Sequence, residues 1–283
     1  MNLMKRIQLF EFEDLPWLPS AVRDSMTRML TLLHSWLGSK EHVAELLFEV
    51  AQQTGRKKIV DYCSGDGGAM PDVLRILRDK YNTSASLVLT DLYPNKDAVT
   101  RIANFRDPHL TYCKDPVDAT EPLPLHAGAI RTMVCSFHHM PPAIARAILK
   151  QASESGDPII IYELSDNSAP PKYLWWIGLP LNLLFGFFVA ARVRPMSPKH
   201  FFFSFLVPII PICFAWDGAV SNARTYTQAD LDELLEGVHS EGYRWTKGKR
   251  GARPMQQLYC IGVPVPSETD LASQRTIDTG TRS

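Results

Sequence analysis

The sequence predicts an α/β fold built on a doubly wound, mostly parallel sheet of seven strands. Three observations lead to this fold class. Residues 59–80 have the pattern of a buried strand, a glycine-rich turn and a helix, which opens many nucleotide-binding sheets. Strand-like and helix-like segments then alternate along the chain, which favours right-handed crossovers between parallel strands. The segment 158–163 is apolar on both faces, as a central parallel strand should be.

Residues 1–54 are expected to form an N-terminal helical cap. The first 19 residues mix aromatic and acidic side chains, so we expect them to pack on the body of the protein or to cover the cofactor. Apolar residues recur at helical spacing over about 20–37 and again over about 40–53. This spacing predicts two helices, and a glycine follows each of them as a stop signal.

Residues 55–171 are expected to form the cofactor-binding core. The alternating apolar segments of this region predict five strands, at 59–62, 85–91, 110–112, 129–137 and 158–163. Helices are predicted between them, at about 70–80, 96–105 and 143–153.

Residues 172–217 interrupt this alternation with an apolar insert. Leu174 to Ala191 and Phe201 to Trp216 contain no charged residue. Three interpretations stay open. Two membrane-spanning helices would need about 20 apolar residues each, and the second stretch is short and contains two prolines. A monotopic hairpin would dip into one leaflet with its basic turn near the headgroups. A soluble helical lid would cover an oily pocket, and both this lid and the hairpin indicate a hydrophobic substrate.

The fold is expected to resume over 218–264. Thr227 is a candidate cap for a helix over about 228–235, and strands are predicted at about 243–247 and 257–263. A basic run lies in and around the turn between these strands, where it either faces solvent or binds anionic lipid: Arg244, Lys247, Lys249, Arg250 and Arg253. Residues 265–283 are polar and are expected to be a disordered tail.

Composition narrows the classes of partner. The chain has 30 basic and 30 acidic residues, so its formal net charge is zero and nucleic acid is not an expected partner. The five cysteines are scattered without a CxxC pair. We therefore expect reduced thiols in a cytosolic protein, with neither a disulfide framework nor a metal site. The N-terminus lacks the apolar stretch of a secretory signal.

The turn after the first strand reads DYCSGDG over residues 61–67. An acid at the strand end is not part of the dinucleotide-binding pattern. The stretch resembles the first motif of class I S-adenosylmethionine-dependent methyltransferases, acid-x-G-x-G-x-G, with Cys63 in place of the first glycine. A small side chain fits there, provided that the turn avoids a backbone angle that only glycine tolerates.

This resemblance implies a seven-stranded Rossmann-like methyltransferase fold and S-adenosylmethionine as cofactor. Asp61 would hold its methionine amino group, Asp91 the ribose hydroxyls, and Asp118 would lie near the adenine amino group. Three acids at successive strand ends suit a cationic ligand that carries no pyrophosphate. The other residues assigned to the cofactor are Cys63, Ser64, Gly65, Gly67, Leu92, Ala119 and Ser136.

The fourth strand is followed by the sequence SFHHMPP at 136–142. It resembles the His-His stretch of small-molecule methyltransferases of the quinone-biosynthesis type, and not the Asn/Asp-Pro-Pro-aromatic motif of base amino-methyltransferases. We predict His138 and His139 as catalytic residues, because an imidazole can take a proton as the methyl group arrives. The alternative for either histidine is a helix-capping or packing role.

Four further positions are candidates near the reacting group. Glu163, with Tyr162, is expected to face the same crevice from the end of the fifth strand and to be a second base. Asp217 and Arg224 follow the insert. They either shape the acceptor site or form an ion pair that anchors the insert.

The sequence therefore predicts methyl transfer from S-adenosylmethionine to a hydrophobic small molecule that resembles a lipid, quinone or isoprenoid. The place of the reaction is expected to be the cytoplasm, at the cytoplasmic face of a membrane if the insert meets one. Two alternatives stay open: a membrane-associated module that binds the cofactor without catalysis, and a methyltransferase acting on protein or nucleic acid. The acceptor atom and the oligomeric state do not follow from the sequence.

Overall fold

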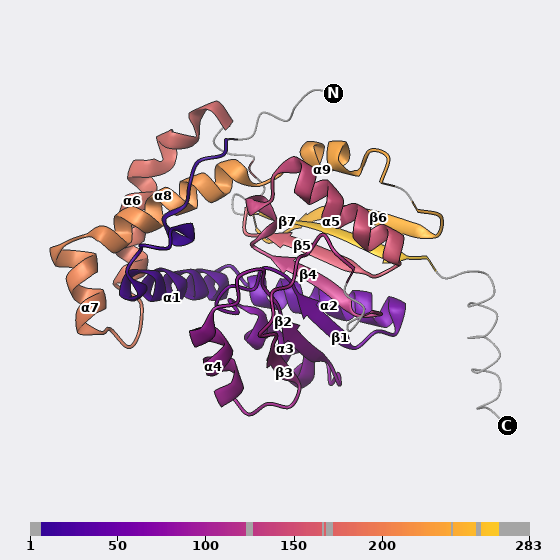
Figure 1. Ribbon diagram of the computed structural model, residues 1–283. Coiled ribbons are helices and arrows are strands. Elements are labelled where there is room, and N and C mark those ends of the chain that lie inside the picture. Colours follow the sequence, from indigo (N-terminus) through magenta and orange to yellow (C-terminus); the bar gives the residue numbers. More distant parts are fainter. Residues whose placement is uncertain are drawn as a thin grey trace.

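The computed structural model describes residues 7–122, 127–165, 167, 172–238, 240–252 and 256–265 (Figure 1). The tail is expected at 265–283, and its residues 266–283 lie outside these ranges, as does Arg253 of the basic run.

A seven-stranded sheet forms the centre of the fold, in the order β3-β2-β1-β4-β5-β7-β6. Its strands are β1 (Lys58–Asp61), β2 (Ser86–Leu89), β3 (Leu110–Tyr112), β4 (Ile130–Val134), β5 (Ile159–Glu163), β6 (Tyr243–Arg250) and β7 (Gln257–Pro264). The first five pair in parallel, whereas β7 pairs antiparallel with both β5 and β6. This mostly parallel, seven-stranded α/β sheet confirms the predicted fold class.

Helices cover both faces of the sheet. One face carries α2 (Ser39–Thr54), α3 (Met70–Asp79) and α4 (Lys96–Asn104), and the other carries α5 (Pro142–Ser155) and α9 (Gln228–Leu235). Alternate residues of a strand enter opposite cores: Ile59 packs with the first helix group and Val60 with the second. Because both faces are buried, β5 begins with three isoleucines, as the sequence indicated, whereas β4 also carries the buried polar residues Arg131 and Thr132.

Local signals fix the ends of these helices. The Asn95 side chain accepts hydrogen bonds from the first turn of α4, and Thr227 forms a reciprocal capping box with Asp230 at the start of α9. Gly55 and Gly156 adopt left-handed backbone angles directly after α2 and α5. Helix α2 belongs to the main core, so it lies against the sheet rather than in a separate cap.

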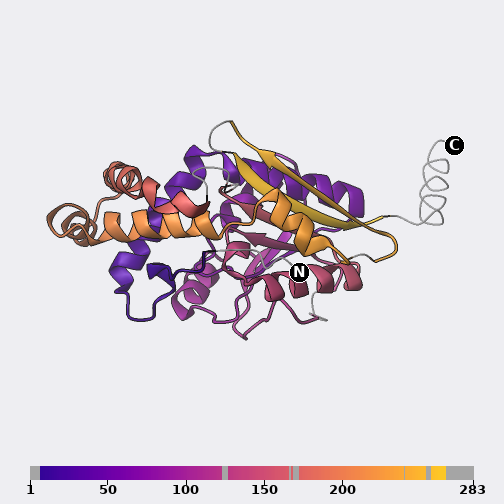
Figure 2. The same cartoon turned by 90° about the horizontal axis from the view of Figure 1, so that it is seen from above.

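The predicted apolar insert forms a helical lobe beside the sheet, together with the N-terminal segment. It contains the 3-10 segment η4 (Lys172–Gly178), α6 (Leu179–Ala190), α7 (Pro198–Phe201), the π-helical turn η5 (Phe202–Leu206) and α8 (Ile209–Arg224). The N-terminal segment contributes η1 (Phe12–Asp14) and α1 (Ser20–Trp36). Figures 1 and 2 both show α6, α7 and α8 at one end of the molecule, away from β6.

This lobe has its own apolar core. Val22, Met26 and Met29 of α1 pack with Val189 of α6 and Ile210 of α8. The boundary expected at 217 falls inside α8, which runs unbroken from the insert into the C-terminal part of the chain. The insert is therefore joined to the rest of the fold by a rigid helix.

Within the described parts of the chain, no single helix is long and apolar enough to cross a bilayer. The segments Pro198–Leu206 and Ile209–Arg224 reach that length and composition only as a pair, with a bend of 75° between them.

Candidate functional site

The glycine-rich turn follows β1 and closes on itself through the Asp61 side chain. The hydroxyl of Ser64 donates to Asp61 Oδ2 at 2.7 Å, and Thr132 of β4 donates to Asp61 Oδ1 at 2.6 Å. Cys63 has a φ of +54°, in the left-handed region. Our expectation that this position avoids such an angle was wrong, because the turn uses the left-handed conformation that glycine adopts more easily.

Asp61 is a buried acid, and its hydrogen bonds offset only part of the cost of removing its carboxylate from water. Burial raises the pKa of its carboxyl to about 7, and the two hydroxyl hydrogen bonds oppose this shift. The nearby Asp91 carboxylate raises the pKa further. A cation bound beside Asp61 would stabilise its ionised form.

Asp91 and Asp118 follow β2 and β3 at the same edge of the sheet. Asp91 accepts hydrogen bonds from the backbone N–H groups of Gly65, at 2.8 Å, and Tyr93, at 2.9 Å. Asp118 accepts from the backbone and hydroxyl of Thr120. The structure thus brings the three predicted acids to the rim of one cavity.

The other residues assigned to the cofactor line the same cavity: Cys63, Ser64, Gly65, Gly67, Leu92, Ala119 and Ser136. Leu92 is exposed and Ala119 is buried. Ser136 is buried at the end of β4, and its hydroxyl makes no hydrogen bond to any described residue.

The predicted catalytic residues His138 and Glu163 are in direct contact. One Glu163 carboxylate oxygen accepts the backbone N–H of His138 at 2.9 Å, and the other lies 2.8 Å from His138 Nδ1. Burial alone would lower the pKa of His138, but the Glu163 carboxylate raises it above its ordinary value. Glu163 therefore holds His138 in position, and the ring Nε2 faces away from Glu163.

His139 lies next to His138, with the ring centroids 4.3 Å apart. Both histidines belong to the 3-10 turn η3 (Phe137–His139) after β4. His139 Nδ1 lies 3.4 Å from an Asp14 carboxylate oxygen. The two rings thus meet side chains of the N-terminal segment.

Glu11, which was not among the predicted site residues, is buried at the centre of this cluster. Its carboxylate lies 3.8 Å from His138 Nε2 and 3.7 Å from His139 Nε2, and it forms a 2.7 Å ion pair with Arg224. Acidic residues among aromatics at 10–18 were the available signal, but a sequence does not show which acid reaches the histidines.

The N-terminal segment is fastened to α8. Asp217 accepts the backbone N–H groups of Phe12 and Glu13 at 2.7 and 3.0 Å, and Trp216 donates its indole N–H to the Phe10 carbonyl. Both predicted residues after the insert, Asp217 and Arg224, hold this segment. The segment therefore packs on the body of the protein, as one of the two expectations stated.

Tyr162 was expected to face the same crevice as Glu163, and this expectation was wrong. Neighbouring strand residues point to opposite faces, and Tyr162 is fully buried among the residues packed on α2. Its hydroxyl lies 3.0 Å from Gln257 Oε1 and 3.3 Å from His42 Nδ1.

One cavity, of about 1420 Å³, is lined by the glycine turn, the strand-end acids and the cluster around the two histidines. At one end it is lined by the glycine turn and the three strand-end acids. Helices α1, α6 and α8 line another part of it with both apolar and polar side chains. The apolar ones are Met26, Leu30, Leu33, Phe185 and Phe214, and the polar ones include Arg23, Asp24, Thr27, His34, Asn182 and Asn222. Glu11, the two histidines and Glu163 line it as well.

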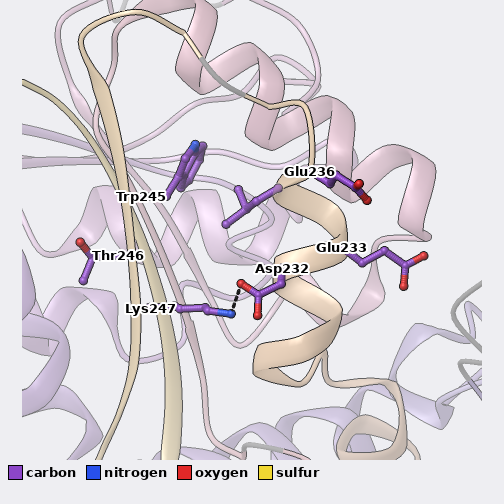
Figure 3. Close-up of a pocket in the computed structure, with 7 residues that line it drawn as sticks. Asp232, Glu233, Glu236, Trp245, Thr246 and Lys247 are labelled. Carbon is purple, nitrogen blue, oxygen red and sulfur yellow. Dashed lines mark ion pairs between the residues drawn. The ribbon is translucent and has the colours of Figure 1, made fainter.

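A second, smaller pocket lies between α9 and β6. Figure 3 shows Lys247 of β6 turned toward Asp232 of α9, with which it forms an ion pair. Arg250, at the end of β6, pairs with Glu45 and Glu49 of α2. These two members of the basic run are therefore paired with acids of the fold.

No family model matches the chain, and no curated protein matches it. Solved structures with a similar fold include an O-methyltransferase family protein from Burkholderia thailandensis. The two are 13% identical, the match covers 87% of this chain and 60% of that chain, and the TM-score is 0.49. A SAM-dependent methyltransferase from Aquifex aeolicus is also 13% identical, with coverage of 78% and 88% and a TM-score of 0.42.

The complex of LepI with SAM is a further similar structure, at 15% identity and a TM-score of 0.43. The match covers 74% of this chain but only 43% of the LepI chain. Such similarities concern the fold. The chain's own strand order is that of a seven-stranded, mostly parallel, Rossmann-like α/β sheet with an antiparallel β7.

Proposed function

We propose that this protein transfers a methyl group from S-adenosylmethionine to a hydrophobic small molecule. The observation that carries the proposal is the single cavity that is lined both by the three strand-end acids and by large apolar side chains of α1, α6 and α8. One end suits a polar, cationic cofactor, and the other suits an oily acceptor.

The electrostatics of the first end support a cationic ligand. The pKa of Cys63 is raised to about 12, first by burial and then by Asp91, Asp61 and Asp118. A site that disfavours a thiolate so strongly also disfavours pyrophosphate, which argues against a dinucleotide. The sulfonium and amino groups of S-adenosylmethionine would instead lower the cost of holding these carboxylates together.

The glycine turn packs closely on the protein at Gly67 and leaves space at Gly65. Gly67 has a φ of +89°, and a Cβ at this position would lie 3.1 Å from a methyl carbon of Leu89. Residues with side chains are therefore disfavoured here, because the turn is packed against β2. Gly65 lines the cavity, and a Cβ there would meet no protein atom within 4 Å, so a ligand could approach its backbone.

The second end supports a nonpolar acceptor. Large apolar side chains of α1, α6 and α8 contribute to its lining, and the histidine–glutamate cluster lines the same cavity. When bound, the cofactor supplies a sulfonium methyl group, which passes to the acceptor atom as a proton leaves that atom. The protein contributes by holding the acceptor in line and by activating its nucleophilic group.

We also infer that the helical lobe rests on a membrane. Large apolar side chains are exposed on η4, α6, α7, η5 and the start of α8: Trp176, Ile177, Leu181, Leu184, Phe188, Phe201, Phe202, Leu206, Val207, Ile209 and Ile212. So many on one lobe is unusual for a surface that meets only water.

Basic residues border this apolar surface. The Arg192 guanidinium lies 4.5 Å from the centre of the Phe188 ring, Arg194 follows in the turn between α6 and α7, and Lys199 lies in α7. Such an arrangement suits a helix hairpin that enters one leaflet beside anionic headgroups, as on the cytoplasmic face of a membrane. The acceptor would then be drawn from the lipid phase into the apolar end of the cavity.

Two experiments test the proposal. Calorimetric titration with S-adenosylmethionine should show binding to the wild-type chain and a large loss in Asp91→Ala, and absent binding would remove the cofactor. A methyl-transfer screen of a lipid extract, with cofactor labelled on the methyl group, should yield a labelled nonpolar product. Cofactor binding without any labelled product would instead favour a binding module.

A further inference from the structure

We propose that Glu11, His138 and His139 bind a divalent metal ion at the acceptor end of the cavity. The distances between the ligand atoms support the metal site itself, whereas its role in activating an acceptor hydroxyl rests on the proposed function. This site was not expected from the sequence, because Glu11 is far from the two histidines along the chain.

The geometry gathers three ligand atoms around one point. His138 Nε2 lies 3.8 Å from one Glu11 carboxylate oxygen, and His139 Nε2 lies 3.7 Å from the other. One ligand atom from each residue falls within 4.8 Å of the other two. Two ligand atoms bound to the same ion at about 2.0–2.1 Å lie roughly 3 Å apart. Small side-chain movements would therefore complete the site.

The far side of each imidazole is already held by a carboxylate. His138 Nδ1 lies 2.8 Å from Glu163, and His139 Nδ1 lies 3.4 Å from Asp14. A neutral imidazole that donates Nδ1–H to a carboxylate presents its Nε2 lone pair on the opposite side. Metal-binding histidines are typically oriented and made more basic in this way. Both rings thus have the outer partners of a metal ligand.

Charge and burial favour a cation at this point. Three carboxylates, from Glu11, Asp14 and Glu163, surround the rings, with the Arg224 guanidinium as the compensating cation that contacts Glu11 and Asp14. With both imidazoles neutral, these groups carry a formal charge of −2. The side chains of Glu11, His138 and Glu163 are almost entirely buried. A divalent ion would balance this charge where water cannot screen it.

The donor set indicates the kind of metal. Two imidazole nitrogens and one carboxylate suit Zn²⁺, Mn²⁺, Fe²⁺ or Co²⁺ better than Mg²⁺ or Ca²⁺, which prefer oxygen ligands. A carboxylate has lone pairs on both oxygens, so Glu11 can accept from Arg224 and still bind the ion. Three protein ligands leave coordination positions for a further group from the cavity.

A bound hydroxyl of the acceptor would occupy one of those positions. The metal lowers the pKa of an oxygen bound to it, so the O–H bond breaks and its proton passes to solvent. The resulting oxyanion then forms the O–CH₃ bond as the S–CH₃ bond of the cofactor breaks. In this arrangement the histidines act as ligands rather than as proton acceptors.

Metal binding can be measured without methyl transfer. The full-length protein is stripped with a chelator and titrated with Co²⁺, followed by visible absorption and by calorimetry. We expect one ion per chain, with at least tenfold weaker binding in Glu11→Gln, His138→Asn and His139→Asn. Glu163→Gln, which removes only an outer partner, should weaken binding roughly 10–100-fold. His109→Asn and Glu41→Gln, which lie outside the cluster, should bind as the wild type does.

Folding and cofactor binding are checked on the same samples by circular dichroism and S-adenosylmethionine titration. Glu11→Gln is the safest variant, because Glu11 lies outside the sheet. Absent Co²⁺ binding, or binding that Glu11→Gln and His139→Asn leave unchanged, would overturn the metal site. Metal binding without S-adenosylmethionine binding would instead refute the proposed function and leave the metal site standing.

Discussion

Cofactor affinity should depend on pH through Asp61. Burial raises the pKa of this carboxyl to about 7, whereas in the unfolded chain it stays near 3.8. If Asp61 holds the cofactor's amino group in its ionised form, binding must expel a proton from the part of the population that is protonated. The affinity should therefore rise with pH until Asp61 is ionised in the free protein.

The size of the effect follows from the titration of one group. With a pKa of about 7, only about one-eleventh of Asp61 is ionised at pH 6, compared with about three-quarters at pH 7.5. We expect the affinity for S-adenosylmethionine to be roughly five- to tenfold weaker at pH 6 than at pH 7.5. Above that range the cofactor's own amino group begins to lose its proton, near pH ~8.

The same shift has an opposite consequence for the free protein. Because the folded-state pKa exceeds the unfolded one, the contribution of Asp61 to stability is fully present below about pH 4. This contribution declines as the pH rises toward 7. The pKa differs by about three units between the two states, and each unit corresponds to ~1.36 kcal/mol, so the loss is about 4 kcal/mol at most. Asp61→Asn keeps the shape and stays uncharged. One of its two acceptor oxygens becomes an NH₂ donor, to which a reoriented hydroxyl of Ser64 or Thr132 can still bond. The substitution should therefore raise the melting temperature of the free protein at pH 8.

Calorimetric titration at several pH values, in buffers of different ionisation enthalpy, measures both the affinity and the proton released. Asp61→Asn should bind weakly and lose this pH dependence. Asp217→Asn is the matched control: burial also raises the pKa of Asp217 to about 7, but this residue lies at the acceptor end. The reasoning fails if wild-type affinity is the same at pH 6 and 7.5, or if Asp61→Asn binds tightly.

Three further changes test the fold and the lobe. Gly67→Ala should cost about 1–3 kcal/mol in chemical denaturation, because its methyl group would meet a leucine side chain at 3.1 Å, whereas Gly68→Ala has open space and should cost less. Asp157→Ala leaves two arginines without their buried partner and should cost about 3–5 kcal/mol, unlike an exposed acid. Leu181→Ser with Leu184→Ser should reduce flotation with vesicles of phosphatidylcholine and phosphatidylserine at unchanged melting temperature; flotation equal to wild type would contradict the membrane surface.

The parts of the fold that follow from local pattern could be predicted. Strand and helix positions in the sheet agree with the structure to within a few residues, because burial on both faces and capping residues leave a direct trace in the sequence. The strand-end acids were found for a similar reason, since parallel strands place their carboxyl ends at one edge. Asp61, Asp91 and Asp118 indeed line one cavity.

The acceptor end depends on contacts between distant segments, which a single sequence does not reveal. Glu11 meets Arg224 across 213 positions, and Asp217 meets the backbone of Phe12 across 205. The backbone angle at Cys63 was also mispredicted, because the turn's geometry overrides the ordinary preference of a side chain. Such tertiary effects can be seen only in three dimensions.

The contact between Glu11 and Arg224 also bears on how the protein is made. On the ribosome the segment around Glu11 leaves the exit tunnel early, and its partners on α8 follow more than two hundred residues later. The strands that carry the acids at the glycine turn are complete well before that point. A nascent chain could therefore assemble much of its cofactor end while the acceptor end is still open, and acceptor recognition would be among the last properties that the chain acquires.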